Sequence, residues 1–287
     1  KGWTVDDTLP NPNKVAIDRF EAKLNDTLAK VTQLYETFRL SEALTTVYRL
    51  VWDEFCARYL EIIKPAYDQA AQQSLPIDHD TYRITVQYFD TLMRLLHPFM
   101  PFITEEVWQY LQPRTEGESI CVASYPTAYA FDQTIIEEAT RIFEIVQNIN
   151  NIRQQQQLKK SEVIEVYFTD ESYAQLYTVK FALTIQKLAG VGNITLTTAK
   201  PSETVGFIVG SEEFFIPVTQ TIDVEVEKQK LIKELDYQKG FLQSVEKKLS
   251  NERFVSNAPE KVVALEKKKK EDAEAKIKAL EESLAAL

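Results

Sequence analysis

The sequence predicts a mainly α-helical protein with three parts: a helical bundle, a small α+β subdomain and a C-terminal antiparallel coiled-coil hairpin. Apolar residues recur at helical spacing through residues 13–111. Strand-length segments with alternating apolar and polar residues follow, and a heptad repeat begins near residue 231 and resumes after a proline-containing break. The changes between these patterns place the domains at residues 1–130, 131–222 and 223–287.

Residues 1–130 should form an up-and-down bundle of four helices, because the connections between the helical segments are short. The first two helices carry apolar residues three or four positions apart, at Phe20, Leu24, Leu28, Val31, Leu34 and Phe38, and at Leu44, Val47, Val51, Phe55, Tyr59 and Ile63. The third helix begins at about Asp80 and ends at His97-Pro98, since proline disfavours helical geometry in the preceding residue. Thr104 is expected to cap the fourth helix, which continues through Trp108.

Residues 131–222 change from a purely helical pattern to a mixed one. The pattern predicts a helix over 135–152, a strand over 164–168, a helix over about 173–188, and strands over 194–196, 205–209 and 214–218. Gly210 to Glu212 should join the last two strands as a hairpin. We therefore expect a small α+β subdomain.

From residue 223 the pattern becomes a heptad. One seam contains Leu231, Leu235, Gln238, Leu242, Val245 and Leu249, and a second contains Val263, Lys270, Ala273, Ile277, Leu280, Leu284 and Leu287. Such spacing keeps one side of a helix facing a partner helix. One chain that folds back on itself accounts for both seams.

The closed end of this hairpin should be basic, because residues 246–270 contain eight basic and four acidic side chains. The whole chain carries a net charge of −10, but residues 223–287 contain 14 basic and 14 acidic side chains, so the acidic excess lies before them. Phosphate contacts depend on local potential rather than on total charge. An acidic protein with a basic hairpin tip can therefore bind nucleic acid.

Several functional classes are disfavoured by the composition. The seven glycines form neither a phosphate-binding loop nor a dinucleotide fingerprint, and the two histidines and two cysteines lack zinc-site spacing. We therefore expect no catalytic residue, no metal and no cofactor in this chain. Two cysteines cannot build a disulfide framework, and no apolar run approaches the roughly 20 residues of a membrane helix, so the expected location is the cytoplasm without membrane contact. The start at Lys1, without a methionine or targeting peptide, indicates an excised fragment.

Three stretches are more particular than a generic helical protein requires. Residues 51–61 (VWDEFCARYLE) and 95–108 (LLHPFMPFITEEVW) resemble the anticodon-binding helical domain of the class I synthetases for valine, isoleucine and leucine. Residues 247–255 (KKLSNERFV) with 258–263 (APEKVV) are similar to the coiled-coil tip of valyl-tRNA synthetases. Isoleucyl enzymes tend to end in a cysteine-rich zinc module and leucyl enzymes in a different small domain, so the third stretch favours valine.

The resemblance implies a monomer that binds the tRNA for valine at two places, the anticodon on the bundle and the outer corner on the coiled-coil arm. It implies that the catalytic and editing domains of the parent chain, a valine–tRNA ligase, hold ATP and valine, and that this fragment alone is not catalytic. The candidate tRNA-binding residues on the anticodon side are Arg58, Lys64 and Arg94. Those at the coiled-coil tip are Lys247, Lys248, Asn251, Arg253, Phe254 and Lys261.

Other interpretations of the same residues stay open. Trp52, Phe55 and Trp108 lie on apolar faces, where core packing competes with stacking on an anticodon base. Lys267 to Lys270 can be a solvated charge run, and Phe254 can cover the end of the hairpin seam. His97 fits a helix-terminal hydrogen bond better than a base contact. A coiled-coil scaffold without RNA specificity is the alternative function, and the fragment alone can also lack measurable RNA binding.

Overall fold

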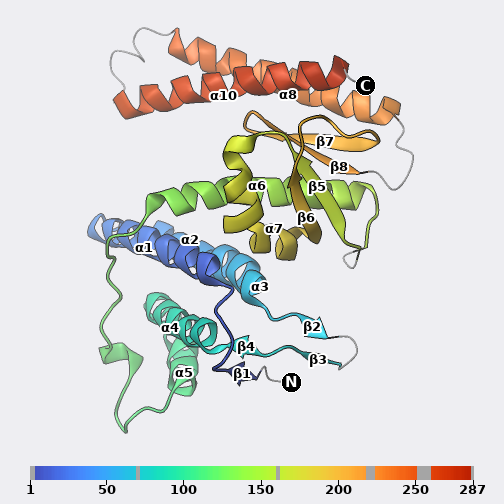
Figure 1. The fold of residues 1–287 in the computed structure, drawn as a ribbon. Helices are drawn as coiled ribbons and strands as arrows, with labels where there is room; N and C mark the ends of the chain where they lie inside the picture. The colour runs from blue at the N-terminus through green and yellow to red at the C-terminus, as the bar shows by residue number, and fades with distance from the viewer. Residues whose placement is uncertain (1–3, 69–71, 160–161, 218–223, 251–259, 286–287) are drawn as a thin grey trace. The chain divides into compact units, whose positions relative to one another are not determined.

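The computed structural model describes residues 4–68, 72–159, 162–217, 224–250 and 260–285. The chain forms two compact units, Lys1–Ile142 and Phe143–Leu287. The predicted domain boundaries at residues 130 and 222 stay predictions. Helices dominate both units, and the mainly α fold class is confirmed (Figure 1).

The first unit contains the predicted helical bundle. Its helices are α1 (Lys14–Glu36), α2 (Leu40–Arg49), the π-helical segment η1 (Leu50–Tyr59), α3 (Leu60–Ile63), α4 (His79–Leu96), α5 (Pro101–Leu111) and the short η2 (Ile120–Val122). Two small strand pairs accompany them: β1 (Val5–Asp6) with β4 (Ile77–Asp78), and β2 (Tyr67–Asp68) with β3 (Gln73–Ser74). The α2, η1 and α3 segments follow one another without a break, as the single predicted helix over residues 44–63 required.

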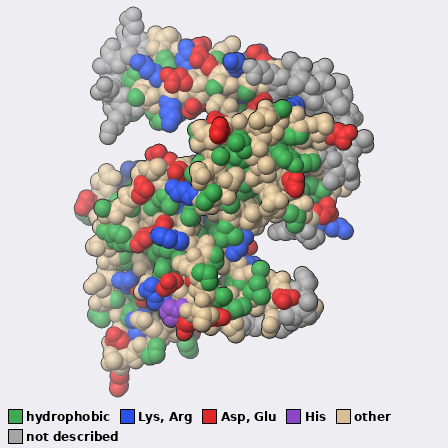
Figure 2. Space-filling view, in the orientation of Figure 1, with side chains coloured by type: hydrophobic (Ala, Val, Ile, Leu, Met, Phe, Trp, Pro, Cys, Tyr) green, Lys and Arg blue, Asp and Glu red, His purple; other side chains and the backbone are tan. Residues whose placement is uncertain are grey.

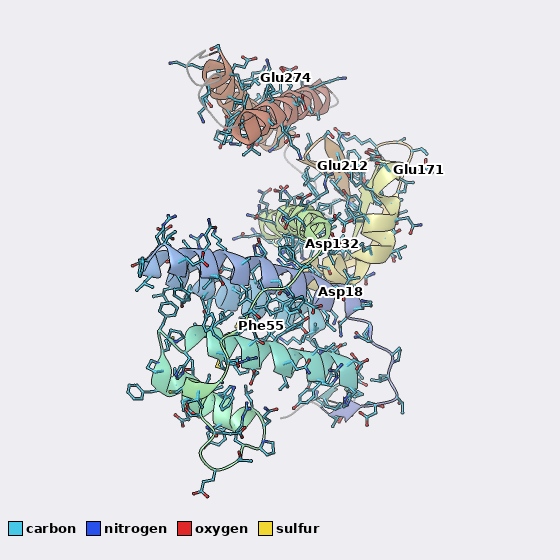
Figure 3. The ribbon with its side chains drawn as sticks, turned by 90° about the vertical axis from the view of Figure 1, so that its left-hand side faces the viewer. Asp18, Phe55, Asp132, Glu171, Glu212 and Glu274 are labelled. Atoms are coloured by element: carbon cyan, nitrogen blue, oxygen red, sulfur yellow. The ribbon has the colours of Figure 1, made fainter. Side chains whose placement is uncertain are left out.

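An aromatic cluster forms the centre of the bundle. The Phe20 ring lies 5.3 Å from Phe55, 5.0 Å from Tyr59 and 5.0 Å from Tyr88 between centroids. Phe55 also stacks on Phe89 of α4 at 5.9 Å, and Figure 3 shows Phe55 between α1 and α4. Phe55 is 3 % exposed, so its predicted core position is confirmed.

The π-helical segment explains why Trp52 is exposed. Buried residues along this helix are spaced by three or four, except for a step of five from Leu50 to Phe55. A π turn closes its hydrogen bond one residue later than an α turn, so it brings Phe55 rather than Glu54 onto the core face. Trp52 then points outward and is 60 % exposed. The prediction that Trp52 packs in the core is therefore wrong. Trp108 is 5 % exposed and is buried as expected.

Two helix ends differ from the prediction. Helix α1 ends at Glu36, and Phe38 adopts a left-handed backbone (φ 56°) with 88 % of the residue exposed, so it does not continue the apolar seam. Helix α5 begins at Pro101 rather than Thr104. Proline suits the first helical position, and the Thr104 hydroxyl donates to the Met100 carbonyl from within the helix at 2.8 Å.

The second unit contains the α+β subdomain. Its elements are α6 (Gln133–Gln155), which begins in the first unit, β5 (Ile164–Phe168), η3 (Glu171–Tyr173), η4 (Leu176–Lys180), α7 (Ala182–Ala189), β6 (Val191–Leu196), β7 (Thr204–Val209) and β8 (Glu212–Pro217). The strand order is β6-β5-β8-β7, with β5 and β6 parallel and the other pairs antiparallel. The predicted hairpin between the last two strands is confirmed, and the predicted helix over 173–188 is divided into short segments.

Arg153 fixes the junction between α6 and the sheet. Its guanidinium is buried and donates to the carbonyls of Lys159 at 2.5 Å, Glu162 at 2.8 Å and Gly190 at 3.4 Å. Gly190 ends α7 in the left-handed region (φ 63°), which allows β6 to begin at Val191, three residues before the predicted start.

The coiled-coil arm consists of α8 (Val224–Leu249) and α10 (Glu260–Ala285). Figure 1 shows the two helices side by side. Ion pairs between them join Lys239 to Glu281 and Glu246 to Lys270, so the partners run in opposite order along the two helices. This order confirms the predicted antiparallel hairpin.

Candidate nucleic-acid interface

The three cations predicted on the anticodon side each bind an acidic side chain of the bundle. Arg58 pairs with Glu54 at 2.6 Å, Lys64 with Glu61 at 3.3 Å, and Arg94 with Asp90 at 2.8 Å. They lie on three different segments: η1, the residue that follows α3, and α4. Their contact with RNA stays a prediction.

Arg58 belongs to a partly buried charge cluster. Glu54 binds Arg58 and also Arg19 of α1, whose side chain is only 6 % exposed. Burial lowers the pKa of Arg19, and the neighbouring carboxylate of Glu54 opposes that shift. The cluster therefore ties η1 to α1 and gives Arg58 a structural role.

Arg94 lines a groove of about 600 Å³ between α1, α4 and residues 124–129. Its guanidinium also donates to the Ser124 carbonyl at 3.1 Å, which holds the returning chain against α4. Tyr125 and Tyr129 line the same groove. Arg94 is therefore held beside aromatic side chains.

A second aromatic surface lies on the outer face of α2 and η1. The Tyr48 and Trp52 rings are stacked with centroids 6.4 Å apart and an interplanar angle of 9°, and both are more than half exposed. Arg49 is exposed between them in sequence, and its side chain makes no ion pair or hydrogen bond within the part of the chain that the structure describes. We call Tyr48, Arg49 and Trp52 the stacking platform, because flat rings with an adjacent guanidinium are what single-stranded RNA bases bind.

Sequence reasoning left stacking open for Trp52 but did not join Trp52 with Tyr48 and Arg49, for a physical reason. Leu44, Tyr48 and Trp52 recur every four residues, and this repeat is the available signal for a second apolar face. A regular helix would direct part of that repeat inward. Only the five-residue step of η1 separates the outer face from the core face.

The bundle has further exposed apolar side chains where α1 and α4 end. Tyr35 of α1 lies 6.3 Å from Phe99, which follows α4, so these helix ends are neighbours. Phe38 and Phe102 are 88 % and 89 % exposed in the segments that follow. His97 Nδ1 lies 2.8 Å from Thr104 Oγ1, which confirms the expected helix-terminal hydrogen bond.

The arm separates paired lysines from unpaired ones. Lys248 lies 3.8 Å from Glu266, which also binds Lys269 at 2.7 Å. Lys270 binds Glu246 of the opposite helix at 2.9 Å. Figure 2 shows basic and acidic side chains mixed along this part of the molecule.

Several exposed lysines of the arm make no ion pair or hydrogen bond with the described residues, among them Lys247, Lys267 and Lys268. The predicted tip residues Asn251, Arg253 and Phe254 lie outside the described residues, as does the side chain of Lys261. The run at Lys267 to Lys270 is thus divided. Two of its members bind acids of the hairpin, and the other two are exposed without a partner among the described residues.

Within the described ranges, no group of three or more His, Cys, Asp or Glu side chains is placed to hold a metal ion. The same ranges contain no helix with the length and apolar character needed to cross a membrane.

The comparison with protein families identifies both ends of this arrangement. The family described as the anticodon-binding domain of tRNA ligase matches residues 19–168, which is more than half of the chain. The chain belongs to this anticodon-binding family. The family described as the valyl tRNA synthetase tRNA binding arm matches residues 223–287. The first match contains most of α1 and all of α2 to α5, and the second contains α8 and α10.

Curated relatives agree with these families. A valine–tRNA ligase of Parabacteroides distasonis is 45 % identical over the whole chain, and one of Christiangramia forsetii is 40 % identical over the whole chain. One of Listeria innocua is 36 % identical over 92 % of the chain. The chain spans about a third of the length of these relatives, 32 %, 32 % and 30 % respectively.

Proposed function

We propose that this chain is the tRNA-binding C-terminal portion of a valine–tRNA ligase. The bundle receives the anticodon region of tRNA(Val), and the coiled-coil arm contacts the outer corner of the same tRNA. Two family matches on one chain, an anticodon-binding domain and a tRNA-binding arm, are the observation that carries this function.

Aminoacylation takes place in the parent protein rather than in this portion. The catalytic and editing domains of the parent hold ATP and valine, and the present chain supplies affinity and orientation for the acceptor end. The chain acts as a monomer in the cytoplasm and needs no cofactor of its own. Cys56 and Cys121 are both free thiols, which suits a reducing compartment.

The stacking platform is the first part of this proposal to test. An unpaired anticodon-loop base stacks on Trp52, and Arg49 offers its guanidinium to a phosphate or base edge. Trp52→Ala in the 287-residue chain should weaken binding of a tRNA(Val) transcript by roughly 1–3 kcal/mol, measured by filter binding. Tyr110→Ala is the matched control, because Tyr110 is 85 % exposed but lies on α5 outside the platform. Equal, small effects of the two changes would exclude the platform as a base contact.

The arm is tested by its dependence on salt. Replacing Lys267 and Lys268 by Ala should flatten the slope of log affinity against log salt by about one unit for each phosphate contact that the change removes. The double variant Lys239→Ala/Lys276→Ala is the control, because these lysines bind Glu281 and Glu234 across the hairpin. The scaffold alternative predicts little salt dependence and no preference among tRNAs, so an unchanged slope with equal binding of unrelated tRNAs would favour it.

A further inference from the structure

A cysteine and a histidine meet on the surface of the bundle outside the proposed tRNA contacts. His97, which follows α4, places Nε2 3.3 Å from the Sγ atom of Cys121 in η2. The other ring nitrogen, Nδ1, lies 2.8 Å from Thr104 Oγ1 on α5. A nucleophile, a base and a third group that orients the base therefore form a continuous chain of contacts.

The hydroxyl of Thr104 determines which nitrogen carries the proton. Its single hydrogen is donated to the Met100 carbonyl at 2.8 Å, so toward His97 the oxygen must accept. Nδ1 of the neutral ring is then protonated, and Nε2 presents a lone pair to Cys121. This is the tautomer that can take the proton of the thiol.

The loop that carries Cys121 is fixed against α5. The carboxylate of Glu105 accepts from the Ser119 hydroxyl at 2.6 Å and from the Ile120 N–H at 3.1 Å. The hydrogen bond from Gln109, together with these contacts, lowers the pKa of Glu105. Glu105 therefore holds the segment that carries Cys121 against α5.

We propose that Cys121 is a nucleophilic thiol and a modification site for low-molecular-weight disulfides, with His97 as its positioning base. The Cys121 proton moves to His97 Nε2, and the thiolate attacks one sulfur of the disulfide. A new S–S bond forms, the original S–S bond breaks, and the departing thiolate takes up a proton. The products are a mixed disulfide on Cys121 and one free small thiol, so no further oxidant is required.

Cys56 provides an internal comparison. It is also exposed, but the described contacts give it no base, and partial burial raises the pKa of its thiol. An ordinary thiol is only a few per cent ionised near pH 7, and the thiolate is the attacking form. Cys121 should therefore react much faster than Cys56.

The experiment uses the 287-residue chain and the chromogenic disulfide 5,5′-dithiobis(2-nitrobenzoate). The reaction should show a fast and a slow phase, one for each cysteine. The single-cysteine variants Cys56→Ser and Cys121→Ser assign each phase to its thiol, and glutathione in a separate reaction gives the rate of an ordinary thiol. At about pH 7, Cys121 should react about tenfold or more faster than both references. The advantage over glutathione should shrink above the ordinary thiol pKa of about 8.5, where glutathione ionises without help from a base.

His97→Gln separates base assistance from simple exposure. It should remove most of the advantage of Cys121 and leave the rate of Cys56 unchanged. The proposal would be overturned if Cys121 of the unsubstituted 287-residue chain reacted no faster than glutathione. It would also be overturned by a folded His97→Gln variant that keeps the fast phase. The comparison of Cys121 with glutathione in the unsubstituted 287-residue chain, with its pH profile, needs no histidine variant. It therefore tests the proposal even where His97→Gln fails to fold.

Discussion

Glu54 is the acidic centre of the bundle. Its carboxylate accepts from Arg19 of α1 and from Arg58 one helical turn away, and its side chain is only 12 % exposed. A buried ion pair adds little net stability compared with apolar packing, but removal of one partner leaves the other charge buried and uncompensated. The effect of Glu54 on the free energy of unfolding should therefore become visible when its charge is removed.

Glu54→Gln should destabilise the bundle by roughly 3 kcal/mol or more, because the buried guanidinium of Arg19 then loses the charged carboxylate that it binds. Urea unfolding, followed by amide hydrogen exchange in α1, measures the loss. Glu61→Gln is the matched control, since the Lys64–Glu61 pair is more than half exposed and such pairs contribute about 0–1 kcal/mol. Similar losses for both changes would mean that Arg19 is solvated in the folded chain.

Phe55 and Trp52 lie three residues apart and should behave in opposite ways. Phe55→Ala removes a ring that contacts Phe20, Tyr59 and Phe89, and should cost roughly 3–5 kcal/mol of unfolding free energy. Trp52→Ala should cost less than about 1 kcal/mol, because it removes only the stack on Tyr48. Thermal melting of both variants tests the π-helical step. A large loss for Trp52→Ala would place that ring in the core.

At the scale of elements, two glycines should respond oppositely to alanine. Gly190 ends α7 in the left-handed region, and a Cβ there would lie 3.2 Å from Nη1 of Arg153. Gly190→Ala should destabilise α7 and β6 by roughly 1–2 kcal/mol. Gly240 lies within α8 with open space around it, so Gly240→Ala should stabilise the arm by roughly 0.5–1 kcal/mol. Hydrogen exchange of α7 and α8 reports each change locally, and a shift of the same sign in both would contradict these assignments.

Glu266 should make the stability of the arm depend on pH. It occupies the seam of α10 between Val263 and Lys270, and the hydrogen bond from Lys269 lowers its pKa, with further help from Lys248. A depressed carboxyl pKa stabilises the fold above the unfolded value, and that contribution disappears as pH falls through the folded value. Hydrogen exchange of α10 should therefore accelerate between about pH 5 and pH 3 after correction for the intrinsic rate.

Glu266→Gln should remove most of that acid dependence. Glu281→Gln is the control, because its pair with Lys239 is about half exposed and lies farther from the closed end of the arm. If both variants keep the acid dependence of the parent chain, another carboxylate is responsible.

Most elements followed from the sequence, and the exceptions have local causes. The strand at Ile164–Phe168 was predicted with its observed bounds, because alternation in a half-buried strand is strong. The π-helical step at Leu50 was not, since apolar spacing assumes a regular helix. Glu266 was not included in the predicted seam, although it lies three residues after Val263 and four before Lys270. The His97–Cys121 contact joins residues 24 positions apart across a loop, and no periodic pattern encodes such a contact.

At the scale of the whole molecule, the bundle and the arm expose different kinds of side chain. The bundle offers exposed aromatic rings, and the cations predicted to meet RNA there are paired with acids, which suits recognition of unstacked bases. The arm offers Lys247, Lys267 and Lys268 without acidic partners among the described residues, which suits contacts with phosphates. Base readout should therefore depend on the bundle, and salt dependence mainly on the arm.

The most direct measurement is the affinity of the 287-residue chain for a tRNA(Val) transcript and for the same transcript with its anticodon exchanged for that of an unrelated tRNA. Both are titrated at two salt concentrations. We expect weaker binding of the exchanged transcript by about 1–3 kcal/mol for each base contact that the exchange removes, with the same salt slope for both transcripts, because the arm contacts are unchanged. Equal affinities for the two transcripts would contradict anticodon recognition by this chain.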